Sequence, residues 1–225
     1  AWMLVTGGVS AQVDFTTLLN TGSAANLVPF SSTATRKIRT IYRPFDFTTT
    51  PFSGNIDTLF LASASGSGSG TWSNLTISLG QTTDTVLNSS LFSAGLTTVM
   101  QRASFTIPSV SSNQYFAFPL QLPFAYDASL SLIVELSYDE RTSGTGFSVR
   151  SNTLTGRDVT LSGGLQGSPT GTLGAAQRTL GVSIAALPAN DAAVTAFISP
   201  LAPFVPSSAS QVGIEIQNRG SATIT

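Results

Sequence analysis

The chain has 225 residues, with eleven acidic and ten basic side chains, a formal charge of −1, and no histidine or cysteine. The lack of cysteine excludes a disulfide framework, and the lack of both residue types removes the usual ligands of transition metals. A hydrophobic content of 41% is enough for a packed core, which excludes global disorder. The few basic residues are dispersed, so the sequence predicts no nucleic-acid partner.

The first twelve residues, AWMLVTGGVSAQ (1–12), resemble the tail of a secretory signal peptide. An apolar stretch is followed by a Gly pair and then by Val9-Ser10-Ala11, a small-residue cleavage site. The alternative interpretation is a first β-strand over Trp2–Val5. We therefore predict a signal-peptide remnant over 1–12 and an extracellular or cell-surface location. No other segment is apolar and long enough for a membrane-spanning helix, so no membrane span is predicted.

Alternating apolar and polar residues predict antiparallel β-strands along most of the chain. The first two clear candidates are Lys37–Arg43 and Asn55–Ala62, joined by a connection rich in Pro and Phe. The Gly/Ser-rich run 63–71 predicts a loop tip. After it, Leu75–Leu79 alternates strictly, which indicates one buried and one wet face. Thr85–Ala94 is expected to hold one helical turn at most.

The middle of the chain contains the strongest strand signals. Val99–Ile107 and Phe116–Leu122 repeat the alternation, and Pro119 and Pro123 confine the second of these strands to a sheet edge or a bulge. Leu130–Tyr138 has apolar residues on both faces, so we predict that it is a central strand. Shorter strand candidates are Gly146–Arg150, Asp158–Leu161 and Leu180–Ile184.

These short strands predict an all-β fold, an antiparallel, jelly-roll-like β-sandwich over residues 13–187. Residues 188–225 read as a linker and the start of a second, Ig-like β module, with a turn at Asn218-Arg219-Gly220. They are too few for an Ig-like domain of about 100 residues. They therefore either begin a longer domain or add strands to the first domain or to a neighbouring chain.

Six motifs occur in order between residues 35 and 151. They are RKIRTIYRPFDF (Arg36–Phe47), GNIDTLFL (Gly54–Leu61), LTISLGQTTDT (Leu75–Thr85), GLTTVMQRASFTIP (Gly95–Pro108), FPLQLPFAYD (Phe118–Asp127) and LIVELSY (Leu132–Tyr138). Their order and spacing resemble secreted multidomain surface proteins of Bacteroidetes-type bacteria, cargo of the type IX secretion system. The resemblance implies an N-terminal β-sandwich followed by Ig-like repeats, with an adhesive, binding or structural role. It supplies no catalytic residues.

The side chains needed for catalysis are sparse. A glycosidase needs two carboxylates facing each other across a cleft, and the clustered acids Glu135, Asp139 and Glu140 read more simply as solvated acids flanking a turn. A serine nucleophile would lack histidine as its base, and Lys37, the sole lysine, does not belong to an S-x-x-K motif. We therefore expect no enzyme and no catalytic cofactor.

Calcium needs only oxygen ligands, so this composition leaves a calcium site open. Asp127, in the turn YDAS, and the adjacent Asp139 and Glu140 are the candidate ligands, although no EF-hand spacing is present.

Carbohydrate recognition would use exposed aromatic rings. The candidates are Trp72 beside the Gly/Ser-rich loop, Tyr115 and Tyr126; the competing interpretation places Trp72 back against the core. A third option is self-association, in which strands of one copy complete the sheet of another.

The sequence therefore predicts a non-catalytic, extracellular or cell-surface β domain with a structural or adhesive role in a larger secreted protein. The alternatives are a carbohydrate-binding module and a subunit of a self-assembling surface filament joined by β-strand addition. The expected partners are a glycan, a cell-surface protein or a second copy of the chain.

Overall fold

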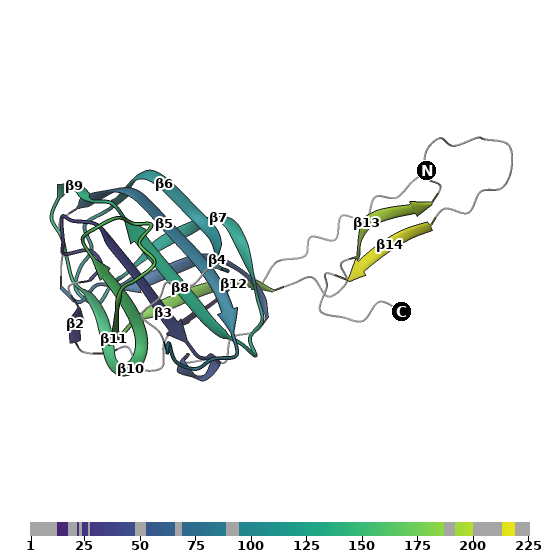
Figure 1. Ribbon diagram of the computed structural model, residues 1–225, viewed down its shortest axis with the longest axis horizontal. Coiled ribbons are helices and arrows are strands. Elements are labelled where there is room, and N and C mark those ends of the chain that lie inside the picture. The colour runs from purple at the N-terminus through teal and green to yellow at the C-terminus, as the bar shows by residue number, and fades with distance from the viewer. Residues whose placement is uncertain are drawn as a thin grey trace, which may run out of the picture. The chain divides into compact units, whose positions relative to one another are not determined.

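The computed structural model describes residues 13–17, 22, 24–26, 28–47, 53–65, 69–88, 95–186, 192–199 and 213–218. Within these residues the chain is almost entirely β-strand, with one short 3-10 turn, η1 (Pro44–Asp46) (Figure 1). The chain divides into two compact units, one over Val13–Ala185 and one that contains the C-terminal strands. The predicted signal-peptide remnant over 1–12 lies outside the described residues.

The first unit is a sandwich of two antiparallel sheets, as the alternating pattern predicted. The smaller sheet has four strands in the order β1 (Val13–Thr17), β12 (Leu180–Ala186), β4 (Gly54–Ala62) and β7 (Tyr115–Tyr126). In β1 and β12, Val13 pairs with Ala185, so the two ends of this unit lie on neighbouring strands.

The larger sheet has eight strands. Six of them follow the order β11 (Thr172–Arg178), β10 (Val149–Ser162), β3 (Arg36–Tyr42), β8 (Ser131–Tyr138), β5 (Gly70–Thr82) and β6 (Thr97–Ile107). The short strands β2 (Ala24–Asn26) and β9 (Arg141–Gly144) pair with β10 and β5. The predicted central position of Leu130–Tyr138 is confirmed, because β8 lies between β3 and β5.

The two prolines of β7 have the predicted effect. The strand forms one edge of the four-stranded sheet, and its pairing with β4 shifts between Ile56↔Phe124 and Thr58↔Pro119. This shift is a bulge, and Pro119 and Pro123 lie at its two ends. Proline has no N–H for the ladder, so an edge and a bulge are where a strand can hold it.

The core lies between the sheets and is rich in aromatic rings. Phe30 is at its centre, with ring-centroid distances of 5.1 Å to Trp72, 5.2 Å to Phe147 and 5.8 Å to Phe116. The pairs with Trp72 and Phe116 have the edge-to-face geometry that aromatic quadrupoles favour, and the pair with Phe147 is stacked. The core continues into aliphatic side chains from both sheets, including Ile56, Leu59, Ile77, Leu79, Leu136 and Val182.

The chain passes from one sheet to the other at Thr179, with no loop between β11 and β12. Thr179 is fully buried; its N–H donates to the Arg150 carbonyl at 2.8 Å, and its carbonyl accepts from the Ala62 N–H at 3.3 Å. A bridge between Ser63 and Val149 reinforces this corner. The end of β4 and the start of β10 are therefore fixed beside each other.

In the second unit, β13 (Ala192–Ser199) and β14 (Gly213–Asn218) form an antiparallel hairpin. The predicted strands at the start of a second module therefore exist and pair. That they open an Ig-like domain stays a prediction, and Arg219 and Gly220 of the expected turn lie outside the described residues. The described part of the expected turn Thr85–Ala94, residues 85–88, contains no helix.

Candidate functional site

Trp72 does not lie at a loop tip, and its predicted role as an exposed ligand-binding ring is wrong. Strand β5 begins at Gly70, so Trp72 belongs to the strand and is fully buried. Strict alternation with Leu75 would place Trp72 on the opposite face. Asn74 has a positive φ of 51°, and this irregularity allows both side chains to face the core.

Tyr126 is also buried, so the expectation of an exposed ring fails here too. Only 4% of the residue is exposed, and its hydroxyl has no hydrogen-bond partner among the described residues. Burial, with a smaller contribution from the Asp127 charge, raises the pKa of Tyr126 to about 12. The ring belongs to the core beneath the end of β7.

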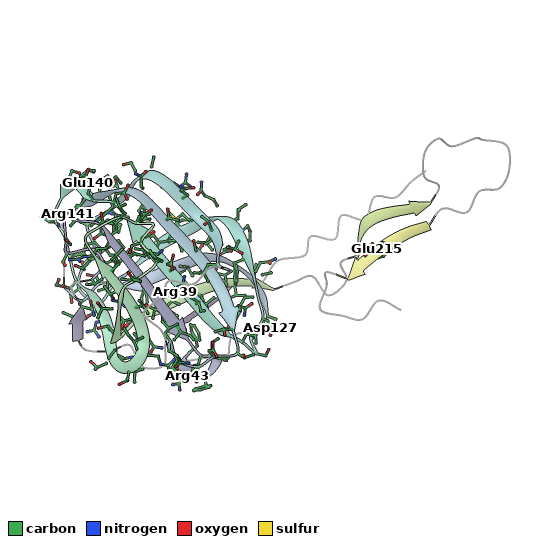
Figure 2. The ribbon with its side chains drawn as sticks, in the orientation of Figure 1. Arg39, Arg43, Asp127, Glu140, Arg141 and Glu215 are labelled. Carbon is green, nitrogen blue, oxygen red and sulfur yellow. The ribbon has the colours of Figure 1, made fainter. Side chains whose placement is uncertain are left out.

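The candidate calcium ligands do not come together. Asp127 precedes β8 and Asp139 and Glu140 follow it, so the length of β8 places them roughly 25 Å apart. Figure 2 shows Asp127 and Glu140 at opposite ends of the sandwich. Among the described residues, no three acidic side chains gather in a way that could hold a metal ion.

Each of the two aspartates has a structural partner. The Asp127 carboxylate accepts from the Ser129 N–H at 2.9 Å and from the Ser129 hydroxyl at 2.8 Å, and these two bonds lower the pKa of Asp127. Asp139 accepts from the Asn74 side-chain amide at 2.6 Å. The Ser129 contacts close the turn before β8, and the Asn74 contact joins the end of β8 to β5.

Glu135, the remaining acid of the predicted cluster, is engaged by two cations. It accepts from Arg39 Nε at 2.9 Å and from Arg39 Nη2 at 2.6 Å, and Lys37 Nζ lies 3.5 Å from its other oxygen. The register of β8 separates Glu135 from Asp139 by half the strand. The three acids therefore do not form a catalytic pair.

Asp46 is the centre of a second polar cluster. It accepts from the backbone and side chain of Arg43, from Arg157 at 3.2 Å and from Gln177 at 2.9 Å. Burial by itself would raise the pKa of Asp46, but these hydrogen bonds and the Arg157 charge outweigh it and lower the pKa.

The remaining predicted residue, Tyr115, lines an open pocket of about 250 Å³ at the corner fixed by Thr179. The other lining residues are Ala62, Asn113 and Arg150. Tyr115 is the first residue of β7 and pairs with Ala62, the last residue of β4. Of the three aromatic residues predicted to bind a ligand, Tyr115 alone is partly exposed.

Arg150 has a fixed position in this pocket. Its Nε donates to Asn113 Oδ1 at 2.7 Å, and its Nη1 donates to the Gly22 carbonyl at 2.6 Å. Asn113 has a φ of +67°, which asparagine tolerates better than most residues, and its N–H donates to the Ser63 carbonyl. The pocket thus combines an aromatic ring, an amide and a guanidinium, the last two joined by a hydrogen bond.

Sequence reasoning missed Arg150 and Asn113. Arg150 ends the strand candidate Gly146–Arg150, and Asn113 lies in a polar turn before β7, so neither stood out by spacing. They meet only because the Ser63–Val149 bridge joins β10 to the end of β4.

No family model, curated protein or solved structure matches this chain. Within the part of the chain that the structure describes, no helix has the length and apolar character needed to cross a membrane.

Proposed function

We propose that this chain is a non-catalytic, extracellular or cell-surface β domain of a larger secreted protein, with an adhesive or structural role. The observation that carries the proposal is the way in which three carboxylates, each at most 13% exposed, are used. Asp46, Glu135 and Asp158 are each held by arginine in ion pairs that join neighbouring strands or turns. Carboxylates engaged in this way stabilise a shape and are not free for acid–base chemistry.

The adhesive part of the proposal rests on the pocket at Tyr115. Ligand sites in proteins are concave and combine apolar or aromatic lining with a few placed polar groups. The Tyr115 pocket has this composition on a small scale. It is open, so it suits a terminal or protruding group on a larger partner, which is what an adhesive surface must recognise.

The test combines binding with turnover, using the full chain. Immobilised protein is exposed to a glycan array, and the retained glycans are then assayed for release of new reducing ends. We expect retention without cleavage. Cleavage that is lost in Glu135→Gln, while Glu140→Gln keeps it and both variants stay folded, would overturn the non-catalytic proposal. Retention of no glycan and of no cell surface would overturn the adhesive role.

A second candidate function, assembly by strand addition, is favoured by the unequal edges of the sandwich. The edge strand β7 contains two prolines, whereas the edge strand β6 contains none, and its residues 101–104 are exposed. The Gln101 N–H donates to the Gln121 side chain at 2.6 Å, so it points away from β5. By alternation the Ala103 N–H points to the same side of β6, beyond the point where Gln121 of β7 reaches this strand, and an added strand would pair on that side.

Assembly is tested by the mass of the full chain as its concentration rises. If β6 accepts a strand, Ala103→Pro removes one outward N–H and shifts the population toward monomer. Ala103→Ser is the matched control that keeps the N–H. A strictly monomeric protein at high concentration, or oligomers that are indifferent to Ala103→Pro, would reject this candidate.

A further inference from the structure

We propose that Arg150, Asn113 and Tyr115 form a binding site for a carboxylated sugar, such as a uronic acid unit of an acidic polysaccharide. The inference rests on the proposed adhesive function, because it names the ligand class of that surface. In this site Arg150 supplies the positive charge and Asn113 holds the Arg150 guanidinium in position.

The Arg150 guanidinium is held in place by hydrogen bonds but is not neutralised by them. Two of its five N–H donors bind neutral oxygens, Asn113 Oδ1 and the Gly22 carbonyl. These bonds fix the plane of the group and leave its positive charge uncompensated. The other donors, including both on Nη2, make no hydrogen bond with a described residue.

Arg150 differs from four other arginines of the sandwich, which are paired with carboxylates. Arg39, Arg43, Arg157 and Arg178 each have a carboxylate oxygen within 3.2 Å. Arg150 is half-buried and is held by its two hydrogen bonds, but it forms no ion pair with any described carboxylate. A fixed guanidinium with free donors at an open pocket matches the planar, two-oxygen geometry of a carboxylate.

The lining of the pocket favours a sugar as the molecule that carries the carboxylate. The Tyr115 ring lines the same pocket, and the apolar face of a sugar ring can pack against an aromatic face. The volume of about 250 Å³ suits one ring of a chain whose neighbours remain in solvent. The Asn113 amide borders the pocket and offers Nδ2 as a donor to a ring hydroxyl.

The experiment compares two matched probes on the full chain. One is a polygalacturonate oligosaccharide; the other is the same oligosaccharide with each carboxylate reduced to a hydroxymethyl group. We expect the uronate to bind at least tenfold more tightly than the reduced form, and its affinity to fall as salt rises. Calorimetry gives both dissociation constants.

Three variants test the residues. Arg150→Gln should weaken uronate binding at least tenfold, whereas Arg102→Gln, which removes the same charge from an exposed position on β6, should leave it unchanged. Asn113→Gly keeps a residue that tolerates a positive φ but removes the oxygen that accepts the hydrogen bond from Arg150. This variant should therefore bind the uronate more weakly. Its weak binding of the reduced oligosaccharide should not change. Thermal unfolding checks that each variant is folded, and Tyr115→Phe provides a conservative variant that should retain binding.

The outcomes separate this inference from the function on which it rests. Equal binding of both oligosaccharides would overturn the acidic-sugar inference and leave the adhesive role intact. Binding of polyglutamate with the same Arg150 dependence would assign the pocket to acidic peptides and overturn the sugar class. If neither oligosaccharide binds while the glycan array or a cell surface retains the chain, only this inference fails.

Discussion

Arg178 and Asp158 form an ion pair inside the sandwich, with Nη1 of the arginine 2.8 Å from Oδ2 of the aspartate. Their side chains are 1% and 4% exposed. Asp158 also accepts from the Ala176 N–H, and Arg178 lines a small cavity of about 20 Å³ with Thr40, Tyr42 and apolar residues of both sheets. The pair therefore links β10 and β11 from the core side.

Removing one partner of this pair should cost more than removing both. Asp158→Asn leaves the Arg178 charge buried without its counter-charge, and we expect the free energy of unfolding to fall by about 3–5 kcal/mol. The double variant Asp158→Asn with Arg178→Met should recover part of this loss, because methionine fills the space without a charge. Urea denaturation of the full chain measures both. A double variant less stable than Asp158→Asn would contradict the argument.

Trp72 should matter for stability and not for ligand binding. Trp72→Ala deletes a fully buried ring that contacts Phe30 edge-to-face, so unfolding should become easier by about 3–5 kcal/mol. Tyr115→Ala changes a half-buried residue, so the free energy of unfolding should fall only slightly, whereas glycan retention should be lost. Thermal unfolding and the glycan array, read per folded molecule, distinguish the two. Loss of retention in folded Trp72→Phe would contradict this assignment.

Asp46 should make the sandwich sensitive to acid. Its pKa in the folded state lies below its ordinary value of 3.8, so the ionised form stabilises the fold above that value. This stabilisation is lost as the pH falls through the folded-state pKa. Asp46→Asn should therefore lower the free energy of unfolding at pH 7 and reduce its further fall in acid. Urea titrations from pH 7 to pH 2 test this, with Glu140→Gln as the control for net charge; an unchanged acid slope in Asp46→Asn would refute it.

Two glycines with similar positive φ separate conformational strain from steric clash. Gly144 has a φ of +72°, and an added Cβ would lie 2.0 Å from the Ser69 carbonyl oxygen. Gly163 has a φ of +77° with nothing within 4 Å of that position. Gly163→Ala should cost about 1–2 kcal/mol, the price of the left-handed conformation alone. Gly144→Ala should cost clearly more, because the backbone of β5 or β9 must also move; equal losses in urea denaturation would contradict this.

The parts of the fold that were predictable depend on local pattern. Apolar residues on both faces of Leu130–Tyr138 indicate a central strand, with a neighbouring strand on each side. Pro119 and Pro123 indicate an edge strand, because proline has no backbone N–H to donate to a neighbour. The burial of Trp72 was not predictable in this way, because one positive φ at Asn74 reverses the face on which the ring lies. A Gly/Ser-rich run also gave no sign that strand β5 begins at Gly70.

The candidate site was predictable only at Tyr115. Arg150 and Asn113 are 37 residues apart and belong to a strand start and a turn. Their meeting depends on the pairing of Ser63 with Val149 and on the sheet crossing at Thr179, which are long-range features of the register. Asp127 and Asp139 do not share a calcium site for a related reason, since β8 separates its two ends.

The pairing of Val13 with Ala185 has a mechanical consequence. Tension applied through the chain on both sides of the Val13–Ala185 unit reaches the same rung of the β1–β12 ladder from opposite strands. The force then breaks the hydrogen bonds between β1 and β12 one pair after another, starting at Val13 and Ala185, and does not load all of them at once. Under pulling, β1 should peel away at low force while the aromatic interior stays closed, so the domain would lengthen by a short step before it gives way.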